Sequence, residues 1–87
     1  MPEFRQYSLV FSEPAADFIL ALSSRRRRKI RDSAGRLARD PFVRSDYAVT
    51  DDVGRAIEHL LIEEFVFAYR LDHAAREVRI VDIDDAS

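Results

Sequence analysis

The sequence predicts an α+β domain in which an N-terminal strand, an α-hairpin and a C-terminal antiparallel β-meander follow one another (β-α-α-β-β-β). Three observations support this prediction. Apolar and polar residues alternate near the N-terminus, apolar residues then recur at helical spacing, and three strand-like runs follow at close intervals toward the C-terminus. The 87 residues, 47% of them hydrophobic, suffice for one compact core, so residues 1–87 are expected to form a single domain.

The first predicted strand carries Tyr7, Leu9 and Phe11 on one side. Ser12 is a favoured helix N-cap, and Pro14 occupies the first turn, where its missing N–H costs no hydrogen bond. A helix is therefore expected to begin here. Its apolar stripe comprises Ala15, Phe18, Ile19 and Leu22.

A second helix is expected after a break at Ser23 and Ser24, and the two helices form the α-hairpin. Asp40-Pro41 ends this helix, because proline disfavours helical backbone in the residue before it. The helix carries a dense basic block, although the net charge of the chain is only −2. Such a block forms either a solvated face or a surface that attracts phosphate groups. Its members are Arg25, Arg26, Arg27, Arg28, Lys29 and Arg31.

The segment 42–54 is rich in turn-forming residues and is interpreted as a connecting arm. Within it, only Tyr47-Ala48-Val49 has the composition of a brief strand. Three strand-like runs come next and predict the meander. They cover residues 56–62, 65–71 and 78–83.

A two-residue turn at Glu63-Glu64 pairs Ile62 with Phe65 and decides which side chains share a face. Because Glu disfavours the positive φ of tight hairpin turns, a longer loop is the alternative. With the short turn, the face expected to pack on the helices collects Leu60, Ile62, Phe65, Phe67, Tyr69 and Leu71. The opposite, open face collects Ile57, His59, Leu61, Val66, Ala68 and Arg70.

A loop at residues 73–76 places Arg70 opposite Arg79 and extends the open face to Val81 and Ile83. His59 then clusters with the two arginines. Opposed cations are unfavourable unless an anion lies between them, so the cluster is a candidate phosphate site. A register shift of one residue would send each of these side chains to the other face.

The order strand, α-hairpin, arm ending in Gly54-Arg55, and then FVFAYRLD followed by EVRIVDI resembles the RelE/ParE superfamily of toxins. These toxins belong to toxin–antitoxin modules. The resemblance covers nearly the whole chain and rests on pattern rather than on an invariant signature. It implies a cytoplasmic toxin whose partner is a cognate antitoxin protein.

For the mRNA-cleaving members, the resemblance implies a ribosome-dependent endonuclease that binds the ribosome and mRNA. In such a site, cations stabilise the charge of the transition state and a nearby group transfers protons. Histidine is the residue type suited to that transfer near neutral pH. The catalytic candidates are His59, Arg70 and Arg79. The candidates for RNA or phosphate binding are Arg55, Arg25, Arg28 and Lys29.

Two departures from the superfamily pattern count against inherited catalysis. Val66 stands where mRNA-cleaving members carry a catalytic Arg, and the sequence ends at Ser87 without the C-terminal Arg and Tyr of many such members. Two other functions therefore stay open. One is a non-enzymatic toxin that, like ParE, poisons DNA gyrase by protein contact, and the other is a degenerate member that serves as an interaction domain.

Each candidate residue also has a simpler interpretation. His59, Arg70 and Arg79 are alternatively solvated residues of a polar sheet face, and His73 is interpreted as an ordinary turn residue. Arg55 alternatively tethers the arm through Asp51 or Asp52. The apolar part of the open face is either an antitoxin groove or a homodimer interface.

Composition excludes several classes of function. The chain has no Cys, which rules out a disulfide framework and a thiolate metal site. It shows neither His and carboxylates at metal-ligand spacing nor a Gly-rich phosphate loop, so no metal and no cofactor are expected. No stretch approaches the ~20 apolar residues of a membrane span, and the N-terminus lacks a secretion signal, so the cytoplasm is expected.

Overall fold

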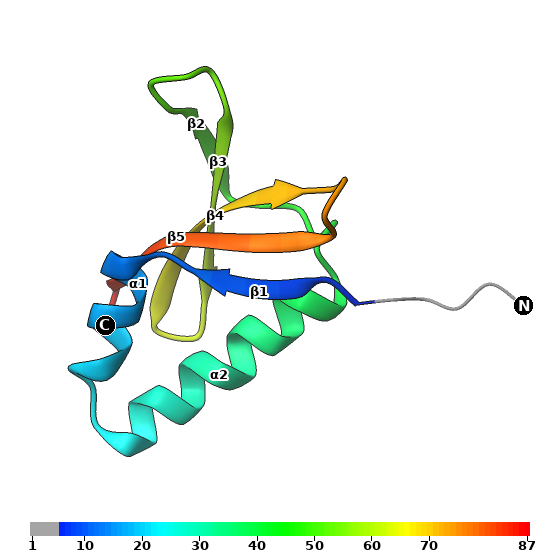
Figure 1. Cartoon of the computed structure of the whole chain (residues 1–87). Helices are drawn as coiled ribbons and strands as arrows, with labels where there is room; N and C mark the ends of the chain where they lie inside the picture. Colours follow the sequence, from blue (N-terminus) through cyan, green and yellow to red (C-terminus); the bar gives the residue numbers. More distant parts are fainter. Residues whose placement is uncertain (1–5) are drawn as a thin grey trace, which may run out of the picture.

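A computed structural model describes residues 6–87 and shows a mixed sheet with two helices against one of its faces (Figure 1). Residues 1–5 lie outside the described residues. They include the start of the N-terminus, for which the sequence predicts no secretion signal. In chain order the elements are β1 (Ser8–Phe11), α1 (Glu13–Leu20), α2 (Ser24–Arg39), β2 (Tyr47–Thr50), β3 (Ala56–Ile62), β4 (Phe65–Asp72) and β5 (Glu77–Asp85).

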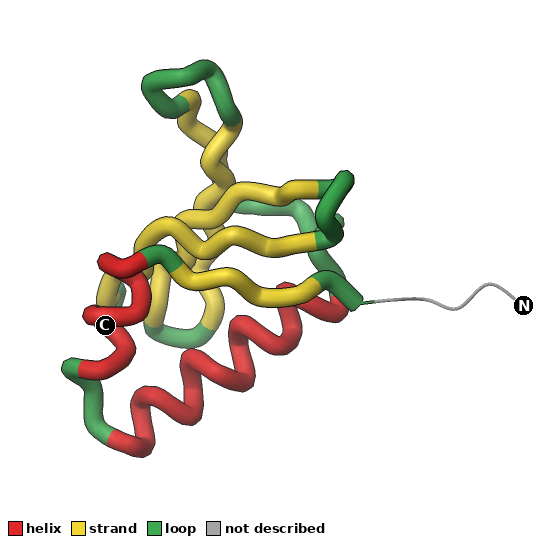
Figure 2. Tube along the Cα trace, in the orientation of Figure 1, coloured by secondary structure: helices red, strands yellow, loops and turns green. Residues whose placement is uncertain are grey.

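The described residues form a five-stranded sheet in the order β1-β5-β4-β3-β2. β1 pairs in parallel with β5, and the other neighbours are antiparallel. The predicted fold class is confirmed, and the brief strand considered at Tyr47-Ala48-Val49 is present as the four-residue strand β2, which pairs with β3 and so adds part of the arm to the sheet. The β2–β3 hairpin extends beyond the rest of the sheet (Figure 2).

Ser12 joins the first strand, the first helix and the last strand. As predicted, it is the N-cap of α1, where its Oγ accepts a hydrogen bond from the Ala15 N–H at 3.2 Å. The same hydroxyl donates to the carbonyl oxygen of Val81 at 2.7 Å. Ser23 caps α2 in the same manner, and α2 ends before Asp40-Pro41.

The core lies between the helices and the covered face of the sheet. β4 contributes Phe65, Phe67 and Tyr69 to it, each at most 1% exposed. Burial of apolar area at roughly 25 cal/mol per Å² makes these large side chains a main source of stability. The other buried members are Ala15, Ile30, Ala34, Leu37, Ile62, Val78, Ile80 and Ile83.

The predicted two-residue turn at Glu63-Glu64 is present, with Ile62 opposite Phe65. Glu63 adopts a φ of 59°, the left-handed conformation that non-glycine residues disfavour. The longer loop considered as an alternative is therefore not needed.

A bulge in β5 corrects one prediction. The pairing shifts between Ala68 and Tyr69, which leaves Val81 as an additional residue between Ile80, opposite Tyr69, and Asp82, opposite Ala68. Ile83, predicted on the open face, instead lies opposite Phe67 and is 1% exposed in the core.

Candidate functional site on the open sheet face

The strand register arranges the open-face side chains in rows that cross the sheet, because directly opposed residues project to the same side. The row nearest the β3–β4 turn, which we call the acidic row, holds Leu61, Val66 and Asp84. The middle row holds Tyr47, His59, Ala68 and Asp82. The basic row holds Val10, Arg79 and Arg70, and Ile57, which lines the same hollow, continues it to its partner Val49.

The basic row borders a hollow of about 370 Å³. Arg70 and Arg79 face each other, as the sequence predicts, and Arg55 joins them at its wall. The remaining lining residues are Val10, Phe11, Ser12, Asp51, Ile57, Ile80 and Val81. Three arginines thus line the same hollow.

Neighbouring carboxylates already offset much of this positive charge. Nη2 of Arg79 lies 3.0 Å from Oε1 of Glu77, and Nε of Arg55 lies 2.9 Å from Oδ2 of Asp51. Arg55 therefore makes the tether that was its alternative role. Its backbone N–H also donates to Asp51 at 2.8 Å, and this bond is the largest cause of the lowered pKa of that carboxyl. Within residues 6–87, Arg70 is the arginine of the hollow without an ion pair.

His59 does not line the hollow of the arginines. Its ring stacks on Tyr47 with centroids 4.5 Å apart and planes 8° from parallel, and its Nδ1 lies 3.2 Å from the Ile57 carbonyl oxygen. It belongs to the next row, about 6.6 Å away along the strand. The predicted three-residue cluster is thus not gathered in one cavity.

His73 lies at the far end of β4 and lines a neighbouring hollow with Arg55 and Arg70. Its Nδ1 is 2.7 Å from the hydroxyl of Tyr7, and its ring stacks on Phe42. These contacts fit the ordinary turn residue that the sequence predicts.

The acidic character of the open face was missed by sequence reasoning. Asp82 and Asp84 are exposed opposite Ala68 and Val66. At the edge of β3, Oδ2 of Asp46 accepts a hydrogen bond from the Leu61 N–H at 2.8 Å. Beyond the basic row, Asp72 and Glu77 also oppose each other. The carboxylates of the face are thus Asp46, Asp72, Glu77, Asp82 and Asp84, whereas its cations are Arg55, Arg70 and Arg79.

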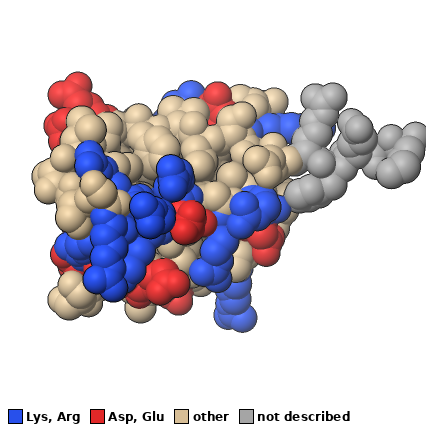
Figure 3. Space-filling view, turned by 90° about the horizontal axis from the view of Figure 1, so that it is seen from below, with Lys and Arg blue, Asp and Glu red and all other residues tan. Residues whose placement is uncertain are grey.

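The basic block of α2 divides into two groups. Figure 3, a view from the side on which α2 lies, shows Lys and Arg gathered over this surface with Asp and Glu among them. Arg25 and Arg28 are exposed and available to an anion. Lys29, the third predicted phosphate ligand on this helix, is instead paired with Glu64.

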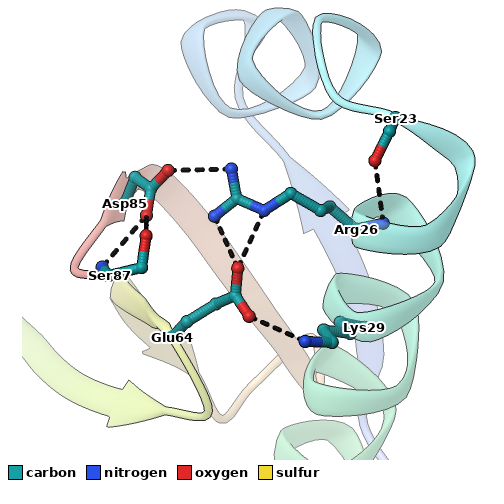
Figure 4. A network of polar contacts seen from close by, with 6 residues as sticks. All are labelled: Ser23, Arg26, Lys29, Glu64, Asp85 and Ser87. Atoms are coloured by element: carbon teal, nitrogen blue, oxygen red, sulfur yellow. Dashed lines mark hydrogen bonds and ion pairs between the residues drawn. The ribbon is translucent and has the colours of Figure 1, made fainter.

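Arg26 and Lys29 form an ion-pair network, the latch, that ties two chain segments to α2 (Figure 4). Nη2 of Arg26 lies 2.6 Å from Oε2 of Glu64, Nη1 lies 2.8 Å from Oδ2 of Asp85, and the guanidinium covers the ring of Phe65. Hydrogen bonds from Lys29 and Arg26 lower the pKa of Glu64, and the hydrogen bond from Arg26 is the largest cause of the lowered pKa of Asp85. The latch also holds the Glu63-Glu64 turn, where the backbone is unfavourable for Glu.

A second hollow, of about 430 Å³, lies between α2 and the edge of β3. Leu61 and Val43 line it, with Arg36 and Arg39 opposed by Asp40 and Glu63, so its lining has no dominant charge. Among residues 6–87, no three metal-ligating side chains come together, and no helix is long and apolar enough to span a membrane.

The element order, the α-hairpin on one face and the parallel β1–β5 pair define an α+β domain with one helical layer and one mixed sheet. No family model and no curated protein matches the sequence. Solved structures do match it, and they show that the fold is the RelE toxin fold.

Three of these structures are representative. A chain of the toxin–antitoxin complex RelBE2 from Mycobacterium tuberculosis matches with a TM-score of 0.78 and 20% identity over 100% of both chains. The isolated RelE toxin of E. coli gives 0.73 and 15% identity over 93% of this chain and 85% of that one. The RelE–RelB complex of Pyrococcus horikoshii gives 0.72 and 9% identity over 94% and 97%.

Proposed function

We propose that this protein is the toxin of a toxin–antitoxin pair and that a cognate antitoxin protein holds it inactive in the cytoplasm. The observation that carries the proposal is the match along the whole chain to a chain of a toxin–antitoxin complex. Two of the matched structures, from Pyrococcus horikoshii and E. coli, are complexes of RelE with RelB. An antitoxin is therefore the first partner to test.

The toxin acts by contact with a protein target. The open face carries more carboxylates than cations, and a net negative surface repels the phosphate backbone of RNA. His59, the residue suited to proton transfer, lies outside the hollow that the arginines line. A toxin that binds a protein, such as DNA gyrase in the manner of ParE, needs no catalytic group.

Ribosome-dependent cleavage of mRNA is the second candidate, and two features favour it. Arg70, without an ion pair among the described residues, projects into the hollow with two other arginines. Arg25 and Arg28 are exposed on α2, where they could contact ribosomal RNA. In this mechanism Arg70 stabilises the charge on the scissile phosphate and His59 transfers the proton.

Induced expression in a bacterial host, with and without the product of the adjacent reading frame, tests both candidates. The proposal predicts growth arrest that co-expression relieves, together with intact mRNA in primer-extension maps. Growth unaffected by the wild-type chain would refute the toxin function as a whole.

Two variants separate the modes of action. Arg70→Ala should leave growth arrest in place if the toxin acts through a protein, because it removes no required catalytic group. Cleaved mRNA in the wild type, abolished by Arg70→Ala and by His59→Ala with recovery of growth, would establish the second candidate instead. Circular dichroism of each variant controls for folding.

A further inference from the structure

One part of the open face exposes large apolar side chains beside carboxylates. Tyr47 of β2 is 56% exposed and Leu61 of β3 is 52% exposed, although each lies opposite a residue of a neighbouring strand. Val66, opposite Leu61, connects them to β4. Apolar groups that meet on a surface in this way mark a place where a partner binds.

The charge of this part is negative. The acidic and middle rows contain Asp84 and Asp82 and no Lys or Arg, and Asp46 adds a third carboxylate at the edge of β3. We name as the acidic-apolar surface the set Asp46, Tyr47, His59, Leu61, Val66, Asp82 and Asp84. It is well suited to a partner that carries both apolar side chains and positive charge.

The backbone favours contact with the face over addition of a strand. β2 pairs with β3 only as far as His59, so the next residues of β3 have no strand on that side. The side chain of Asp46 occupies this edge by accepting from the Leu61 N–H. An incoming strand would have to displace that bond, whereas side chains that contact the face need displace nothing.

We propose that the acidic-apolar surface binds an extended protein segment in which the side chains that face the surface, every second residue, include both apolar groups and Lys or Arg. In an extended segment successive side chains point to opposite sides and every second one to the same side. The apolar side chains among these facing residues meet Tyr47 and Leu61, while the cations among them reach the carboxylates at the rim. This inference rests on the charges and exposure of the face, and it holds whether or not the protein is a toxin.

Two other occupants are disfavoured by the same charges. A symmetric dimer through this surface would bring two copies of the same negatively charged patch together, because both subunits use the same patch in a two-fold interface. RNA would bring its phosphates against Asp82 and Asp84.

Titration of ¹⁵N-labelled full-length protein tests the proposal with three probes. They are a blocked heptapeptide in which valine and lysine take turns at every second position with serine between them, the same peptide with glutamate in place of lysine, and a single-stranded hexamer of uridine. The lysine peptide should shift the amide signals of Leu61, Val66, Asp82 and Asp84, and the other two probes should not. Signals that shift on α2 instead, or stronger binding of RNA to the open face, would overturn the proposal.

A pair of neutral variants measures the part played by charge. Asp82→Asn with Asp84→Asn should weaken the lysine peptide about 2- to 30-fold, the range for loss of two exposed ion pairs. At position 82, asparagine keeps a side-chain oxygen that can accept the hydrogen bond from the Ile83 N–H, so the variant pair should fold like the wild type. The matched control is Glu13→Gln with Asp32→Asn, two exposed carboxylates on the helices. Equal weakening in both pairs would contradict a specific site, and a concentration-dependent doubling of mass would show that a second copy is the occupant.

Discussion

Replacing Ile83 with alanine should lower the free energy of unfolding by about 3 kcal/mol, within the range for fully buried Ile side chains. The reason is the bulge in β5, which turns this residue into the core opposite Phe67. Ile83 is 1% exposed, so the shortened side chain would leave a cavity that the surrounding aromatic rings cannot easily fill. Val81→Ala, at the bulge and only partly buried, should cost about 1 kcal/mol or less.

The size of this loss relative to the total stability makes it measurable. A chain of 87 residues is expected to unfold with roughly 4 to 13 kcal/mol, so the variant should remain folded at 25 °C. A loss of about 3 kcal/mol should lower the melting temperature by roughly 12 to 24 °C. Urea titration followed by circular dichroism at 222 nm gives both free energies at one temperature.

The comparison of the two variants decides the register. Without the bulge, Ile83 would lie on the open face and Ile83→Ala would cost little. A larger loss for Val81→Ala than for Ile83→Ala would therefore refute the register and, with it, the placement of Asp82 and Asp84 on the open face.

Three further predictions concern single contacts. Ser12→Ala should lower the free energy of unfolding, measured by urea titration, by about 1 to 2 kcal/mol, because the helix cap and the bond to the Val81 carbonyl disappear together. A decrease below a few tenths of a kcal/mol would show that neither bond stabilises the fold. The latch should depend on pH, because Lys29 and Arg26 lower the folded-state pKa of Glu64 below its ordinary value of 4.5 and Arg26 lowers that of Asp85 below 3.8. Its stabilisation is therefore complete above that range and is lost as pH falls through the lowered values. The difference in urea midpoint between wild type and Arg26→Gln should therefore shrink between pH 6 and pH 2, and a constant difference would argue against the latch. Burial raises the pKa of Tyr69 to about 12, so the free energy of unfolding should decrease as pH rises above the ordinary value of 10.0. The absorbance difference at 295 nm between wild type and Tyr69→Phe should have its midpoint near the raised pKa, and a midpoint near the ordinary value would contradict this burial.

The local signals in the sequence predicted most of the fold. Ser12 with Pro14 and the Asp40-Pro41 pair determine helix ends through backbone chemistry that acts within a few residues, and these predictions are confirmed. The opposition of Arg70 and Arg79 was also predictable, because two short turns fix it.

The features that sequence reasoning missed depend on contacts between distant residues. β2 gains its structure from pairing with β3, and the turn-rich composition around it conceals that partner. Val81 and Ile83 are both apolar, so nothing in their residue types reveals which one the bulge turns outward. The pairing of Arg26 with Glu64 and Asp85 likewise joins segments far apart in the chain, so neither interpretation of the basic block included it.

Purified components can decide whether this RelE-fold protein is a toxin that acts through a protein, as proposed, or one that cuts RNA. The full-length chain would be added to a reconstituted translation system with a labelled mRNA, and mRNA integrity and protein synthesis would be followed over time. The proposal predicts intact mRNA and continued synthesis. Accumulation of cleaved mRNA that requires the ribosome and disappears with Arg70→Ala would contradict it.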